Sequence, residues 1–207
     1  MLIIKKALTA SILAGVMMCT AFAKPTQTPP VFVQTVADDV VKQLNKDHAR
    51  LKDPAVSSNI IYTKLLPHAD QTGFSRLVLG SYANQASKAQ RDQFTVNLRH
   101  ALIRNYGGQF AKFSNQSFKM RAYKEPKLGA YPVVTLDFVH NGQKIPVTFQ
   151  LIEKGNTWKV RNVNVAGIDM ALQFRNQFAA TVKRSGNNLD KAIATFNPDA
   201  EVDKKYK

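Results

Sequence analysis

The stretch FSRLVLGSYANQASKAQRDQFTVNLRHALIRNY, residues 74–106, decides the helical part of the fold. A short apolar run and a polar break precede a long amphipathic segment. Ser87 and Gln90 have the spacing of a capping box, in which each side chain satisfies a backbone N–H of the other residue. Gly107-Gly108 is expected to end this helix in the left-handed conformation that glycine adopts at little cost. The apolar residues recur every three or four positions, which places them on one helical face: Phe94, Leu98, Ala101, Leu102 and Tyr106.

Two more helices are expected before this stretch. Residues 24–30 are rich in proline and predict an extended leader. Apolar residues of the first helix, Val33, Val36, Val40 and Leu44, are spaced by three or four. Asp53-Pro54 predicts the start of the second helix, with Asp as N-cap and Pro at the first helical position. That helix is expected to end near Pro67.

After Gly108 the pattern changes to the alternation of half-buried strands. A first strand is expected at Phe118, and the next two flank Asn141-Gly142, the strongest short hairpin signal. Lys154-Gly155-Asn156 predicts the turn into a strand from Trp158 to Val165. Tight turns between consecutive strands predict an antiparallel meander with one apolar face.

The chain then becomes helical again. A stripe from Ile168 to Val182 predicts a helix that Asp169 could cap and that Gly186 ends, and a short last helix follows at Leu189. The expected fold class is therefore α+β, with helices packed on one face of the sheet. Its parts are a mainly helical segment 24–117, an antiparallel sheet 118–165, a helical segment 166–198 and a loose tail 199–207.

The first 23 residues predict a secretory signal peptide. Lys5-Lys6 is its basic part, residues 8–18 are apolar, and Ala21-Phe22-Ala23 has the form of a cleavage site. The apolar part is short for a membrane span, although an uncleaved anchor is the alternative. The only cysteine of the chain, Cys19, lies here and follows Met18 instead of the small residue that a lipoprotein needs. We therefore expect an exported, periplasmic protein cleaved after Ala23, with no thiol chemistry.

The chain is strongly basic, with a formal net charge of +15. Without Lys5 and Lys6, 29 − 2 = 27 basic residues remain against 14 acidic ones, a net +13. Such a charge attracts anionic partners such as acidic proteins or membrane surfaces. The export signal argues against nucleic acid as a partner. The alternative is that the charge only provides solubility.

Recognisable catalytic patterns are missing from the sequence. His48, His68, His100 and His140 have no spacing typical of a metal site, and neither a nucleophile elbow nor a phosphate loop is present. Asp137 alternates with Leu136 and Phe138, so it is expected on the solvent face of its strand. We expect no enzyme, no metal and no cofactor. An exported enzyme with Asp137 as general base remains the alternative, as does a basic interaction module with a tightly packed interior.

Two sets of residues together resemble the MlaC-like family, also called toluene-tolerance or organic-solvent-resistance proteins. The first is Arg76-Leu77-Val78-Leu79-Gly80 with Gln90-Arg91, Phe94 and Tyr106. The second is Trp158-Lys159-Val160, Gly167, Arg175-Asn176-Gln177-Phe178, Gly186 and Leu189. Each motif alone is weak, but their order and spacing extend over nearly the whole chain after residue 23.

The resemblance implies a monomeric periplasmic carrier of phospholipid, with a helical layer on a highly twisted antiparallel sheet and the acyl chains in a cavity between them. Its partners would be an outer-membrane lipoprotein-porin complex and an inner-membrane ABC-transporter complex with a membrane-anchored lipid-binding subunit. The function implied is maintenance of outer-membrane lipid asymmetry, with phospholipid as cargo and no catalysis. Apolar side chains expected to line the cavity, on helices and strands respectively, are Leu77, Leu79, Phe94, Leu98, Leu102, Phe174 and Phe178, and Val134, Leu136, Phe138, Val147, Phe149 and Leu151.

Overall fold

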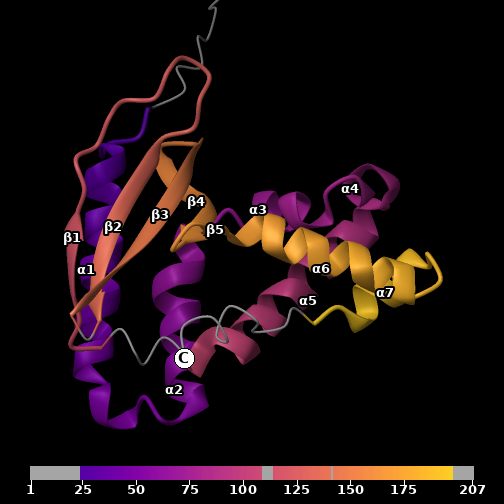
Figure 1. Ribbon diagram of the computed structural model, residues 1–207, viewed down its shortest axis with the longest axis horizontal. Helices are drawn as coiled ribbons and strands as arrows, with labels where there is room; N and C mark the ends of the chain where they lie inside the picture. The colour runs from indigo at the N-terminus through magenta and orange to yellow at the C-terminus, as the bar shows by residue number, and fades with distance from the viewer. Residues whose placement is uncertain (1–23, 109–113, 141, 198–207) are drawn as a thin grey trace, which may run out of the picture.

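The computed structural model describes residues 24–108, 114–140 and 142–197. The expected signal peptide 1–23 and the tail 199–207 lie outside these residues. Within them the chain is α+β, as predicted: helices come first, a five-stranded sheet follows, and two helices end the chain (Figure 1).

The helical segments begin where the sequence provides caps. Ser87 and Gln90 form the predicted capping box, and Asp53 and Asp169 cap their helices as expected. The α-helices are α1 (Pro29–Lys46), α2 (Pro54–Ile60), α3 (Gln71–Leu79), α4 (Tyr82–Gln85), α5 (Lys88–Tyr106), α6 (Met170–Arg184) and α7 (Leu189–Thr195). Short turns η1 (His48–Arg50), η2 (Ile61–Leu65) and η3 (Leu66–His68) connect the early ones.

Two helix ends differ from expectation. Helix α1 begins at Pro29, inside the expected leader, because Pro29 and Pro30 occupy its first turn, where no N–H is needed. Gly107 ends α5 with φ −55°, in the right-handed region, so the expected left-handed glycine is not used. The predicted end of α6 is correct, since Gly186 has φ +68° and Asn187 donates back to the Val182 carbonyl.

The sheet is antiparallel throughout, in the order β1-β2-β3-β4-β5. Its strands are β1 (Ser117–Met120), β2 (Val133–His140), β3 (Gln143–Lys154), β4 (Thr157–Val165) and the short β5 (Ile168–Asp169). Gly142 in the first hairpin turn has φ +77°, while Asn141 lies outside the described residues. A bulge at Gln150/Leu151 shifts the pairing of β3 with β4.

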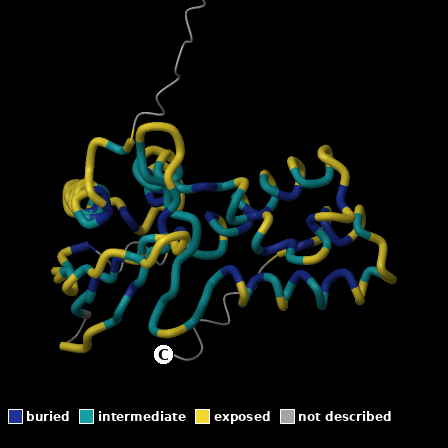
Figure 2. The backbone as a smooth tube through the Cα atoms, turned by 90° about the horizontal axis from the view of Figure 1, so that it is seen from above, coloured by how far each residue is buried: buried dark blue, intermediate teal, exposed yellow. Residues whose placement is uncertain are grey.

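Buried side chains gather in three clusters. One lies between α1 and the sheet, one between α1 and α2, and one among the helices α3–α7. The helices of the third cluster extend away from the sheet beyond its β5 edge (Figure 1). Figure 2 shows the result: buried positions alternate along these helices, whereas long stretches of the rest are half-buried.

Candidate functional site

Apolar side chains line up across the central strands on one face of the sheet. Leu136 pairs with Val147, which pairs with Val165, and Val134 pairs with Phe149, which pairs with Val163. Directly paired residues of antiparallel strands point to the same face. The alternation in the sequence therefore produces one continuous apolar surface, as predicted.

Helix α1 covers only part of this surface. Phe32 and Val33 are buried against Val134, Leu136 and Leu151. Other residues of the same cluster remain partly exposed: Val36, Ala37, Phe118, Met120, Tyr123, Phe138, Phe149, Trp158 and Val160.

Strand β4 has no fully buried residue, although it lies inside the sheet. It lies between β3 and β5, yet all nine of its residues are half-buried and none is buried. An inner strand that contributes to a closed core ordinarily buries one of its two faces completely. The apolar side of β4, including Val163 and Val165, thus leaves surface against which an apolar ligand could pack.

The first half of β4 is nevertheless firmly held. Trp158 donates from its indole N–H to the Gln27 carbonyl at 2.8 Å, and the Asp70 amide donates to the Val160 carbonyl at 2.8 Å. His68 next to this junction contacts the ring of Phe32 edge-on, and burial lowers the pKa of that imidazole, as does nearby Lys159. The half-buried strand is therefore part of a fixed framework.

The helical residues expected to line a cavity pack mainly on each other. Phe94 is fully buried, with its ring centroid 4.7 Å from that of Phe178 and 5.6 Å from that of Phe196. Leu98 is 2% exposed in the same cluster. Predicted lining residues in this helical cluster, buried or partly buried, are Leu79, Phe94, Leu98, Leu102, Phe174 and Phe178.

The structure therefore separates the thirteen predicted lining residues. Leu77 is half-buried on α3, and Val147 is buried on β3. The cluster between α1 and the sheet contains the others: Val134, Leu136, Phe138, Phe149 and Leu151.

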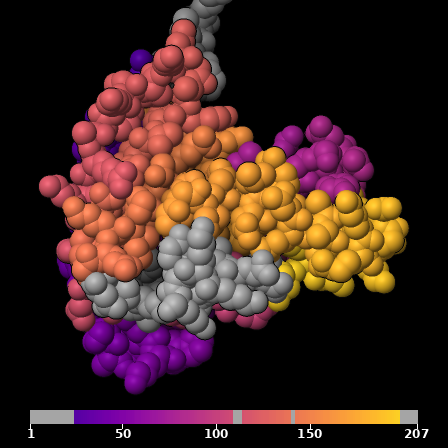
Figure 3. All heavy atoms as spheres, in the orientation of Figure 1, coloured from indigo at the N-terminus to yellow at the C-terminus, as the bar shows by residue number. Residues whose placement is uncertain are grey.

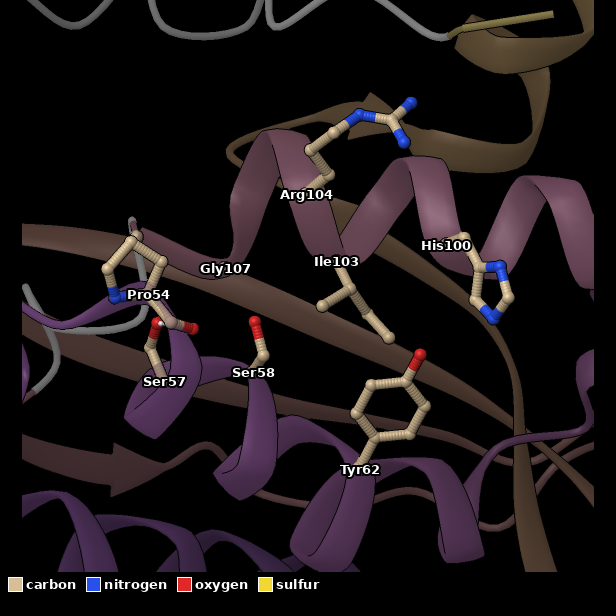
Figure 4. Close-up of a pocket in the computed structure, with 9 residues that line it drawn as sticks. Pro54, Ser57, Ser58, Tyr62, His100, Ile103, Arg104 and Gly107 are labelled. Atoms are coloured by element: carbon tan, nitrogen blue, oxygen red, sulfur yellow. Dashed lines mark hydrogen bonds between the residues drawn. The ribbon is translucent and has the colours of Figure 1, made fainter.

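A pocket of about 320 Å³ lies between α2, η2 and the end of α5, and its lining was not foreseen from the sequence. Figure 4 shows Tyr62 and Ile103 pointing toward one another across it, with Ser58 beside them. Arg104 is directed away, and it donates to Asn197 at 2.9 Å. This volume is at the lower end of the range of small-molecule pockets. A spacing signal could not have found it, because its walls are more than 35 residues apart in the chain.

A second, more open pocket of about 650 Å³ is polar. Its charged residues are Arg99, Lys154 and Lys159 against the single carboxylate of Asp70. Asp70 caps α3 by accepting from the Gly73 amide at 3.1 Å, and Lys154 lies 3.9 Å from the same carboxylate. Its excess of cations suits an anion better than an apolar ligand.

Asp137 does not have the environment of a general base. Arg121 contacts both of its carboxylate oxygens, at 2.7 to 2.9 Å. The hydrogen bond from Arg121 lowers the pKa of Asp137, whereas a general base near neutral pH needs a raised one. The pairing with Lys119 and Pro146 also places Asp137 on the face opposite Leu136, as the alternation predicted. The enzyme hypothesis built on Asp137 is therefore wrong.

Within residues 24–108, 114–140 and 142–197, no helix combines the length and apolar character required to cross a bilayer. The same residues contain no cluster of three or more His, Cys, Asp or Glu that could hold a metal ion.

Comparison with known proteins agrees with this architecture. The model of the MlaC protein family matches residues 34–197. The toluene tolerance protein ttg2D of Pseudomonas putida is 31% identical over 169 residues, 81% of this chain and 79% of that protein. The intermembrane phospholipid transport system binding protein MlaC of Haemophilus influenzae is 26% identical over 198 residues, 93% of this chain and 91% of its own length.

A solved structure has the same fold. The phospholipid-binding protein of Ralstonia solanacearum, determined in complex with a phospholipid, superposes with a TM-score of 0.72 and 23% identity. The match covers 81% of this chain and 98% of that one. With the family model matched over most of the sequence, this chain belongs to the MlaC protein family.

Proposed function

We propose that this protein is a periplasmic phospholipid carrier that holds acyl chains against the apolar face of its sheet. The observation that carries the proposal is the half-buried state of all nine residues of β4. Apolar surface at the centre of a sheet is costly to leave in water, and each CH₂ group buried there gains about 0.8 kcal/mol. A lipid chain would supply the missing cover.

The relatives support this choice of ligand. The Ralstonia protein with the same fold was solved with a phospholipid bound, and the Haemophilus relative is named for phospholipid transport. The paired residues named above on the apolar face of the sheet also favour an acyl chain over a polar substrate. In this proposal the head group stays toward water.

We assign the acyl chains to the partly exposed strand residues of the predicted lining, Phe138 and Phe149, together with the neighbouring apolar side of β4. Phe149 pairs directly with Val163 on that half-buried strand. The helical residues, such as Phe94 and Leu98, already bury their surface within the helical cluster. They would support the site by fixing α6 and α3 beside β4, and a role in direct lipid contact would require these helices to move.

Membership of the MlaC family supports a role in transport. In this proposal the protein moves phospholipid between an outer-membrane lipoprotein-porin complex and an inner-membrane ABC-transporter complex, and so helps maintain the lipid asymmetry of the outer membrane. It acts without catalysis and as a monomer. The net positive charge would favour contact with acidic surfaces on either side.

Lipid analysis of the purified protein tests the central claim. The protein is purified from the periplasm without detergent, and native mass spectrometry should show it with phospholipid bound. After delipidation, the protein should take phospholipid from vesicles. A protein that carries no lipid and accepts none would contradict the carrier and favour a basic interaction module.

A further inference from the structure

The connection between β1 and β2, residues 121–132, carries an unusual apolar tip. Leu128 is completely exposed, at 106% of its reference area. At the base of the connection, Tyr131 and Val133 are 40% and 46% exposed. Single exposed apolar residues are common, so the exposure of Leu128 alone does not mark a contact surface; the shape and charge of the loop provide the further evidence.

The tip has a defined shape. The Ala130 amide donates to the Lys127 carbonyl at 2.9 Å, which closes a turn with Leu128 at its first corner. Gly129 follows with φ +81°, the positive value that a type II turn requires at its second corner. Leu128 is therefore held at the outermost point of a hydrogen-bonded turn.

The rest of the connection is tied to the sheet. The Arg121 amide donates to the Thr135 carbonyl, and the Leu151 amide donates to the Pro132 carbonyl, both at 2.9 Å. Tyr123 packs against the cluster between α1 and the sheet. At the base, the Arg161 guanidinium lies over the Tyr131 ring, 4.7 Å from its centroid. This connection, here called the β1–β2 loop, arches over one end of the sheet in Figure 1 and forms the outer edge there in Figure 3.

The charge around the tip is mainly positive. Lys124 and Lys127 are exposed on either side of Glu125, whose carboxylate accepts from the Tyr123 hydroxyl at 3.3 Å. An apolar tip surrounded by lysines, with a tyrosine at its base, has the composition of segments that rest in a membrane interface.

We propose that the β1–β2 loop docks this protein on the surface of an anionic phospholipid bilayer. Leu128 enters the boundary between head groups and acyl chains, Lys124 and Lys127 contact anionic head groups, and Tyr131 lies at head-group level. An acidic protein surface would attract the lysines as well, but it gives no reason to display a leucine that no side chain of this loop covers. The binding surface is separate from the proposed acyl-chain site on the inner face of the sheet.

Vesicle flotation tests the proposal. The protein should bind vesicles of phosphatidylcholine mixed with phosphatidylglycerol, and bind pure phosphatidylcholine much less. Leu128→Asp should lower the partition coefficient by about tenfold, because it removes the apolar anchor and adds a repelled charge. Lys124→Gln combined with Lys127→Gln should lower it by roughly tenfold and weaken its dependence on salt.

Matched variants distinguish binding through the β1–β2 loop from effects of exposed charge and apolar residues elsewhere on the protein. Leu172 on α6 is also exposed, at 50%, so Leu172→Asp should bind like the wild type. Lys52→Gln with Lys191→Gln removes the same charge at exposed positions elsewhere and should have little effect. Wild-type binding by Leu128→Asp, or equal binding to both kinds of vesicle, would overturn the proposal. The proposal would also be overturned if the wild type bound no vesicles while the lysine variant lost binding to polyglutamate. That result would indicate an acidic protein partner.

The test is independent of the cargo. The phospholipid content of Leu128→Asp protein should equal that of the wild type, because the Leu128 side chain points into solvent, away from the proposed acyl-chain site. A carrier that fails to float on vesicles would contradict only the docking surface, and a protein that floats but carries no lipid would contradict only the proposed function.

Discussion

Arg175 on α6 donates a 2.7 Å hydrogen bond from its Nε to the backbone carbonyl of Leu77 on α3, 98 residues earlier in the chain. The carbon stem of the same arginine fills the space beside Gly80, where an added Cβ would lie 2.9 Å from Arg175 Cδ. Gly80 itself has φ +57° and ψ −127°. The Arg175 side chain thus satisfies a backbone carbonyl at the end of α3 and holds α6 against α3, next to β4.

Gly80→Ala should therefore destabilise the protein by about 1 to 3 kcal/mol, since it adds backbone strain and a contact with Arg175. Urea unfolding followed by circular dichroism measures the change. Gly108→Ala is a suitable control, because nothing lies within 4 Å of a Cβ there and its φ is not in the left-handed region. Equal stability of the two variants would contradict the role assigned to Gly80.

Arg175→Met keeps much of the apolar stem but removes the donor to Leu77. We expect a loss of about 1.5 kcal/mol, the typical value for a hydrogen bond from a charged group. The same unfolding experiment measures it. If the bond acts only at the α3–α6 contact, Arg175→Met should add little further destabilisation in a Gly80→Ala background, since the two residues share one contact.

Val163→Asp should remove bound phospholipid while leaving the protein folded, because it places a charge on the half-buried apolar side of β4. Asn164→Asp is the matched control: it adds the same charge one residue later, on the opposite face, where Asn164 accepts from the Gly167 amide. Lipid extracted per mole of folded protein is the measurement. Full lipid content in Val163→Asp protein would show that β4 is not a wall of the site.

Leu98→Ala should cost about 2 to 5 kcal/mol of stability, because Leu98 is buried among helices α3–α7. Val96→Ala, at an exposed position of the same helix, should cost far less. We expect the folded fraction of Leu98→Ala protein to retain its lipid. Selective loss of lipid without loss of stability would instead place Leu98 in the lipid site.

The contribution of the Asp137–Arg121 pair to the stability of the folded protein should depend on pH in a defined direction. The pKa of Asp137 is lowered in the folded protein, chiefly by the hydrogen bond from Arg121. The ionised pair therefore stabilises the fold above the unfolded pKa of about 3.9, and this contribution is lost as the pH falls through the lower folded value. Wild type and Asp137→Asn, unfolded in urea from neutral pH downward, should differ at neutral pH and converge in acid. A difference that grows in acid would contradict the sign.

Local features of this fold could be predicted because their causes are local. The capping box of Ser87 and Gln90 and the caps at Asp53 and Asp169 depend on side chains within three residues of their backbone partners. The alternation through Val134, Leu136 and Phe138 also identified the apolar face correctly. The start of α1 was missed because Pro29 and Pro30 suit both an extended leader and a first helical turn.

The sequence by itself determined the class of the protein: helices with defined ends, an antiparallel meander with one apolar face, and the motifs of its family. Only the tertiary structure decided what each apolar face contacts. Periodicity shows that Phe94 and Leu98 share a face, but the same stripe can pack on a sheet or on other helices, and here it packs within the helical cluster. Likewise, strict alternation from Val160 would place Val163 on the outer face of β4. The bulge in the β3–β4 pairing brings Val163 to the same face as Phe149 instead, and α3 and α6, which are distant in the chain, leave β4 only half-buried.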